Sequence, residues 1–186
     1  MKSLLFLAAA LAGLAAASPF TPRAAPDSGR ARFMLQVESD TTALANQWVS
    51  LESGAISYTL SNSQSQASQF YVTKYDPTGT WSLNAIDNLT HQVALQGPNN
   101  VLLYAIQMSS YTIPCGVQMQ WATFTKDNGV LGVSDGSSLK DRTFVAVQRN
   151  GGTYSVALYD GVSDTKESIT PVTLKLVKVE GSGSEK

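Results

Sequence analysis

Few side chains in this sequence are suited to catalysis, and they are thinly spread. The chain of 186 residues contains one histidine, His91, and one cysteine, Cys115. A catalytic triad would have to use His91 as its base, and this residue shares an alternating strand face with Val93 and Leu95. The sequence therefore favours a non-enzymatic protein.

The sequence also argues against a metal or cofactor site. Zinc sites need several His and Cys ligands, which one residue of each kind does not supply. Asp127-Asn128-Gly129 and Asp135-Gly136 carry oxygen atoms of the type that calcium binds, but hairpin turns use the same residues far more often. We expect neither a metal nor a cofactor.

Cys115 has no partner for a disulfide within the chain. It follows Ile113-Pro114, and the favoured interpretation is a free thiol that is buried and inert. An intermolecular disulfide and a reactive nucleophile are the alternatives.

The elements that position these residues follow a repeat. Four short stretches with alternating apolar residues recur three times, at a spacing of about 50 residues. The repeat predicts twelve strands in three copies. The stretches are 33–37, 48–51, 56–60 and 70–72, then 81–85, 91–95, 102–106 and 119–124, and finally 131–133, 144–147, 154–158 and 172–176.

Alternation also assigns side chains to faces. It places Leu35, Leu83 and Leu174 in the core and turns Gln92 toward solvent. The first two copies end in turn signals, Asp76 to Gly79 and Asp127 to Gly129, in which glycine supplies a positive φ.

Twelve strands in three fourfold units resemble the β-trefoil, the fold of ricin-type lectins, Kunitz-type inhibitors and fungal inhibitors of the mycocypin type. An evenly spaced β-sandwich is the alternative. Ricin-type lectins carry Gln-x-Trp in each repeat, whereas Gln47-Trp48 and Gln120-Trp121 are adjacent pairs, so that sugar site is not carried over. Kunitz-type inhibitors rely on disulfides that one cysteine excludes, while mycocypin-like inhibitors do without them.

Composition and charge fit one all-β domain, which we place at residues 33–180 before a disordered tail at 181–186. Of all residues, 43% are hydrophobic and 15% charged, and the net charge is −1. No basic patch with interleaved aromatic residues is present, so nucleic acid is not an expected partner.

The first residues have the layout of an export signal. Lys2 precedes an apolar run, and Ala15-Ala16-Ala17 precedes a cleavage point before Ser18, which predicts a signal peptide at 1–17. Residues 18–32 are rich in proline and arginine and predict a flexible arm or a pro-segment. An alanine-rich signal before such a segment is similar to many small secreted proteins of filamentous fungi. We expect no transmembrane segment.

Two surface features complete the candidate sites. Asn88-Leu89-Thr90 is an N-glycosylation sequon, and in an exported protein we expect Asn88 to carry a glycan. Tyr71 and Tyr75 share the strand face opposite Phe70 and Val72, and Tyr111 lies in a loop. These three tyrosines are the candidate ligand contacts, and together they would form an aromatic patch that stacks on sugar rings.

The sequence therefore predicts a secreted, extracellular protein that acts by binding. We favour association with the cell wall or the spore surface, with a wall polysaccharide or an extracellular protein as partner. A β-trefoil-type protease inhibitor and an effector directed at a host, with a role in virulence, are the alternatives.

Overall fold

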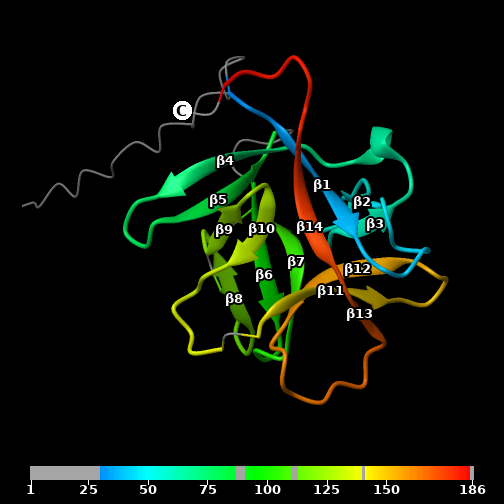
Figure 1. The fold of residues 1–186 in the computed structure, drawn as a ribbon. Helices are drawn as coiled ribbons and strands as arrows, with labels where there is room; N and C mark the ends of the chain where they lie inside the picture. The colour runs from blue at the N-terminus through cyan, green and yellow to red at the C-terminus, as the bar shows by residue number, and fades with distance from the viewer. Residues whose placement is uncertain (1–29, 87–90, 110–112, 140, 185–186) are drawn as a thin grey trace, which may run out of the picture.

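A computed structural model describes residues 30–86, 91–109, 113–139 and 141–184. These residues form fourteen strands and one short 3-10 helix, and no α-helix (Figure 1). The prediction of an all-β fold is confirmed. The strands are β1 (Phe33–Glu38), β2 (Trp48–Ser50), β3 (Thr59–Ser61), β4 (Phe70–Tyr75), β5 (Thr80–Ala85), β6 (Gln92–Gly97), β7 (Leu102–Met108), β8 (Gln118–Trp121), β9 (Phe124–Asp127), β10 (Val130–Val133), β11 (Thr143–Gln148), β12 (Tyr154–Tyr159), β13 (Ile169–Pro171) and β14 (Thr173–Lys178), and the helix is η1 (Gln64–Gln66).

Every one of the twelve predicted stretches overlaps a strand of the structure. One additional strand arises because the last stretch of the second copy is broken, and the other, β13, lies directly before the last stretch of the third copy. Ala122, with φ of 56°, separates β8 from β9, and Val172 separates β13 from β14. A positive φ at a residue other than glycine marks a sharp local departure from the extended backbone.

The strands close into a barrel. Antiparallel pairs link β12, β3, β2, β1, β14, β10, β9, β5, β6 and β7 in that order, and β7 pairs with β12 again. Strands β4, β8, β11 and β13 are added to this ten-strand circuit. The sheet therefore closes on itself, in place of the two separate layers that the alternative sandwich would have.

A shorter closed circuit exists within the same pairings. It runs β1, β4, β5, β9, β10 and β14, and β14 pairs with β1. The hairpins β2–β3, β6–β7 and β11–β12 lie outside this six-strand circuit and contact one another. Their mutual pairs are Thr59 with Ser155, Tyr104 with Ala157, and Ser57 with Ile106.

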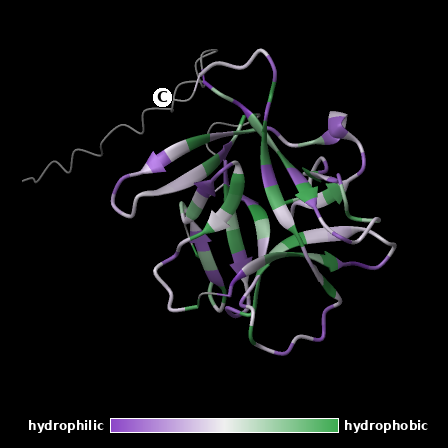
Figure 2. Ribbon diagram, viewed as in Figure 1, coloured by the Kyte–Doolittle hydropathy of each residue, from purple (hydrophilic) through white to green (hydrophobic). Residues whose placement is uncertain are grey.

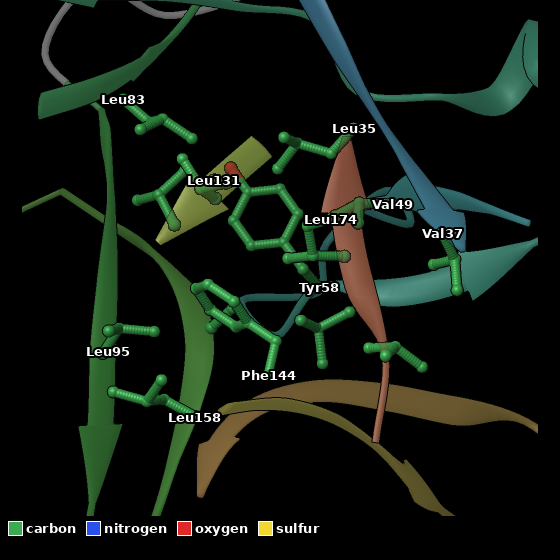
Figure 3. Close-up of a cluster of buried hydrophobic side chains, with 14 of the residues drawn as sticks. Leu35, Val37, Val49, Tyr58, Leu83, Leu95, Leu131, Phe144, Leu158 and Leu174 are labelled. Atoms are coloured by element: carbon green, nitrogen blue, oxygen red, sulfur yellow. The ribbon is translucent and has the colours of Figure 1, made fainter. Parts of the chain in front are cut away.

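The centre of the barrel is filled by apolar side chains from all three copies (Figure 3). Leu35, Leu83 and Leu174 are at most 3% exposed, as predicted. The Tyr58 and Phe70 rings pack with centroids 5.6 Å apart. The space left among these residues is about 10 Å³, at the lower limit for one water molecule. A ligand must therefore bind outside this core.

The prediction that Gln92 faces solvent is wrong, because its side chain is 7% exposed. Strand β6 lies between β7 and β8, and its outer face packs a second apolar cluster. Alternation places Gln92 on the same face as Ala94, and Ala94 is a member of that cluster. The cluster contains Ala94, Ile106 and Met108, with Tyr104, Met119 and Trp121 against them.

The folded domain extends beyond the predicted limits of 33 and 180. The Ala31 N–H donates to the Ser184 carbonyl at 3.3 Å, and the Gly183 N–H donates to the Arg30 carbonyl at 3.2 Å. The Arg32 N–H donates to the Ser182 hydroxyl at 3.1 Å. The signal peptide and the greater part of the predicted arm lie outside the described residues.

Apolar residues follow the strands that line the barrel, whereas η1 and the far end of β4 are hydrophilic (Figure 2). Within the described ranges, the chain forms no helix with the length and apolar character needed to cross a membrane.

Candidate functional site

The structure describes two of the three tyrosines that were predicted as ligand contacts, Tyr71 and Tyr75. Tyr71 is 2% exposed, so its assignment as a ligand contact is wrong. The cause is the chain segment before β1, where the Arg30 guanidinium lies over the Tyr71 ring at 5.4 Å. Tyr75, at the end of β4, is 46% exposed as expected, and Tyr111 lies outside the described residues.

Cys115 is a free, exposed thiol, so the expectation of a buried one is wrong. It sits in a turn in which the Val117 N–H donates to the Pro114 carbonyl at 3.4 Å and Gly116 has φ of 77°. The intermolecular disulfide stays a prediction.

Glycosylation at Asn88 stays a prediction. Asn88 lies outside the described residues. His91 is half-buried just before β6, and its carbonyl accepts a 3.0 Å hydrogen bond from the Ala85 N–H. Among the residues with described positions, no three His, Cys, Asp or Glu side chains group as metal ligands.

One surface groove has a volume of about 580 Å³, and we call it the polar groove. It lies between η1, strands β2 and β3, and the turn of the β11–β12 hairpin, which Figure 1 places on one side of the barrel. Its lining is made of Gln47, Ser50, Leu51, Glu52, Ser53, Thr59, Leu60, Ser61, Asn62, Gln66, Gly152, Thr153 and Tyr154.

Hydrogen bonds fix the η1 wall of the polar groove. The buried Ser50 hydroxyl donates to the Gln66 carbonyl at 2.7 Å, which ties η1 to β2. The Ser61 hydroxyl donates to Gln66 Oε1 at 2.6 Å, which orients the side-chain amide. The Ser68 N–H donates to the Val49 carbonyl at 2.9 Å and continues the link to β2. Among the described residues no acceptor is bound to the Gln66 Nε2 group, which can therefore donate to a ligand.

The opposite wall is a tight hairpin turn. Gly151 and Gly152 have φ of 87° and 79°, left-handed values that glycine adopts without strain. The Arg149 N–H donates to the Thr153 carbonyl at 2.8 Å and closes the turn. Thr153 is thereby presented on the rim, and the half-buried ring of Tyr154 packs against the core beneath it.

Charge is sparse in the polar groove. Glu52 is the single charged side chain among its lining residues, and the other polar groups are hydroxyls and amides. These groups both donate and accept hydrogen bonds without carrying charge. The arrangement suits a neutral, hydroxyl-rich ligand.

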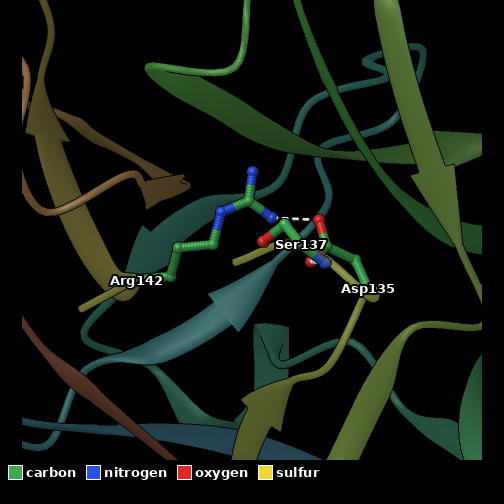
Figure 4. A network of polar contacts seen from close by, with 3 residues as sticks. All are labelled: Asp135, Ser137 and Arg142. Atoms are coloured by element: carbon green, nitrogen blue, oxygen red, sulfur yellow. Dashed lines mark hydrogen bonds and ion pairs between the residues drawn. The ribbon is translucent and has the colours of Figure 1, made fainter. Parts of the chain in front are cut away.

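A buried ionic cluster at the β10–β11 loop is the rival candidate (Figure 4). The Arg142 guanidinium pairs with the Asp135 carboxylate, and their side chains are 6% and 9% exposed. The Ser137 N–H donates to the same carboxylate at 3.0 Å. Burial acts to raise the pKa of Asp135, but the hydrogen bonds from Ser137 and the Arg142 charge hold the pKa below its usual value.

Asp160 extends this cluster to the loop after β12. Its carboxylate accepts hydrogen bonds from the Ser163 hydroxyl at 2.6 Å, the Ser163 N–H at 3.0 Å and the Val162 N–H at 3.1 Å. Burial acts to raise the pKa of Asp160, but these bonds and the Arg142 charge lower it overall. Because Arg142 pairs with Asp135 and both carboxylates accept hydrogen bonds from loop residues, we assign the cluster to holding loops together.

Sequence reasoning missed the polar groove. Its residues come from segments far apart in the chain, and serine, glutamine and asparagine are ordinary loop residues. The one local signal is the polar run Ser61-Asn62-Ser63-Gln64-Ser65-Gln66, which has no apolar residue.

The structure of this groove has to be interpreted from the chain's own residues. Comparison with family models, with curated proteins and with solved structures finds no match to the chain.

Proposed function

We propose that this is a secreted, non-enzymatic protein that binds a neutral carbohydrate of the cell wall or spore surface at the polar groove. The observation that carries the proposal is the fixed set of uncharged hydroxyl and amide groups around Gln66 and Thr153. Secretion and glycosylation at Asn88 are part of the proposal and are supported by the layout of residues 1–17 and by the sequon.

The chemistry of the groove supports a sugar over other ligands. A neutral saccharide presents hydroxyl groups at many angles, and the groove presents donors and acceptors from both walls. Because Ser50 and Ser61 hold the η1 wall in place, less side-chain freedom is lost on binding. The half-buried Tyr154 ring offers an apolar surface for the C–H face of a sugar ring.

We also propose that the barrel is a β-trefoil. The six-strand circuit and the three hairpins that contact one another support this assignment. In each copy the segment before the last barrel strand pairs with the first strand of the local hairpin, as β8 does with β6 and β13 with β11. The Ser68 to Val49 hydrogen bond is the matching contact of the first copy.

The proposal is tested by binding of the secreted protein to insoluble β-glucan, chitin and mannan, measured by depletion from solution. Thr153→Trp fills the rim of the groove, and Gln66→Ala removes the oriented amide; each is expected to weaken binding about tenfold, since each loses about one hydrogen bond or more. Tyr75→Ser is the matched control, because this exposed residue lies on another strand.

Two results would overturn the proposal. One is equal retention of the two groove variants and the parent protein on every polysaccharide that binds. The other is no polysaccharide binding at all combined with a stable complex with an extracellular protease, which would favour the inhibitor. Amino-terminal sequencing of the exported chain tests secretion, and a start at or after Ser18 is expected.

A further inference from the structure

We propose a second binding site, specific for a small oxyanion, in a pocket beside β4 and the two ends of the folded domain. The pocket has a volume of about 180 Å³ and is called here the cationic pocket. It is independent of the polar groove and shares no residue with it. Its lining is Arg30, Ala31, Val72, Thr73, Lys74, Trp81 and Ser184.

Arg30 is held in place from two directions. Its backbone is bridged to Ser184 and accepts a hydrogen bond from the Gly183 N–H at 3.2 Å. Its guanidinium lies 5.4 Å from the centre of the Tyr71 ring. Within the described ranges no carboxylate pairs with this guanidinium. A fixed guanidinium with unused N–H donors is suited to bind the two oxygens of a carboxylate or phosphate group.

Lys74 adds a second positive charge. Its contact with Asp76 is long, at 3.7 Å between Nζ and Oδ1, and both side chains are well exposed. An exposed pair of this kind is weak, so the ammonium group can turn toward an anion in the pocket. None of the described residues that line the pocket carries a carboxylate, and two of them, Arg30 and Lys74, carry a positive charge.

Trp81 gives the pocket an apolar wall. It lies directly across from Lys74 on the neighbouring strand β5, and the Lys126 ammonium lies 4.9 Å from its ring centre. Val72 extends the same wall. The combination of two cations with an indole face fits an oxyanion that is attached to a small ring, such as the carboxylate of an acidic sugar, while the cations alone fit free phosphate.

The pocket is tested on the secreted protein by NMR titration of the Trp81 indole N–H signal, assigned with Trp81→Phe. The probes are sodium glucuronate and inorganic phosphate, with glucose as the uncharged control, all at low ionic strength. Glucuronate is expected to shift the Trp81 signal to saturation, and glucose is not. Mass measurement first establishes that the exported chain retains Arg30.

Variants test whether the shift of the Trp81 signal depends on Arg30 and Lys74. Lys74→Gln and Arg30→Gln are each expected to weaken glucuronate binding at least about tenfold, because each removes a charge-assisted contact. Lys166→Gln, at an exposed lysine in the loop after β12, is the matched control and is expected to change nothing. Because the Lys74 side chain is exposed, Lys74→Gln is expected to fold. It therefore tests the site even if Arg30→Gln does not fold.

The outcomes distinguish an acidic sugar from free phosphate as the ligand, and they distinguish failure of the cationic pocket from failure of the polar groove. Binding of both probes supports an oxyanion site, with tighter binding of glucuronate supporting a ring on Trp81. Binding of phosphate alone supports an oxyanion site that does not use the indole face. The proposal is overturned if neither probe gives a saturable shift, or if Lys74→Gln binds as tightly as the parent. Thr153→Trp leaves this titration unchanged, so failure of either site is seen separately.

Discussion

Two buried centres hold this molecule together by opposite means. The barrel core around Leu83 and Tyr58 is apolar and contains almost no free space. The cluster of Asp135, Arg142 and Asp160 is ionic and joins loops. Apolar packing does not depend on protonation, whereas the cluster contributes only while its carboxylates are charged. The comparison predicts that the two centres respond differently to substitution and to pH.

The largest effect is expected from Leu83→Asp. Leu83 has no exposed surface and lies in the core, so a carboxylate there is buried with no partner. We expect a loss of several kcal/mol in the free energy of unfolding, enough to prevent folding of many domains of this size. Chemical denaturation measures it, and a midpoint equal to that of Tyr75→Ser would contradict the assigned core.

Arg142→Met is expected to have the next largest effect. The substitution leaves the Asp135 carboxylate buried without its cation, and breaking a buried pair in this way costs about 3–5 kcal/mol. Asp135→Asn combined with Arg142→Met is expected to recover part of the loss, because the unpaired charge is gone. If the double variant is as unstable as the sum of the single variants, the pair contributes no coupling energy.

The pH dependence of stability follows from the same cluster. The pKa values of Asp135 and Asp160 are lower in the folded protein than the ordinary value of 3.8. Each group therefore stabilises the fold above the unfolded pKa, and this contribution is lost as the pH falls through the folded pKa. We expect the thermal midpoint to drop below about pH 4. Asp160→Asn is expected to weaken this drop, and an unchanged slope would contradict the role of Asp160.

The smallest effect is expected from Gln92→Met. Gln92 is buried, and within the described structure its Oε1 atom has no hydrogen-bond partner. Replacing the amide by an apolar side chain of similar shape removes an unsatisfied acceptor, so we expect stabilisation of about 1 kcal/mol or less. Gln92→Asp is expected to destabilise. Destabilisation by Gln92→Met would indicate that the amide makes a needed contact.

The strand pattern was predictable because it is local. Alternation and turn residues such as Gly79 and Gly129, which both have a positive φ, are sufficient to place strands along the chain. The break at Ala122 was not predictable, because a single alanine carries no signal for a left-handed backbone.

The prediction of buried and exposed side chains failed where other parts of the chain pack against the outer face of a strand. Tyr71 and Gln92 both lie on faces that alternation assigns to solvent. The Arg30 guanidinium lies over Tyr71, and Gln92 shares its face with the apolar cluster around Ala94. The polar groove was not predicted from the sequence for a related reason. Gln66 and Thr153 meet only after the hairpins contact one another, and nothing in either segment alone indicates the other.

The pairing of Arg30 with Ser184 places the first and the last described residues of the domain side by side. Domains with adjacent ends tolerate a change in the order of their segments. A short linker from residue 184 to residue 30, with a new opening between Gly151 and Gly152, gives a circular permutant that keeps every strand pair. In that molecule the rim of the polar groove becomes the two chain ends, while the linker begins and ends at Ser184 and Arg30, which line the cationic pocket.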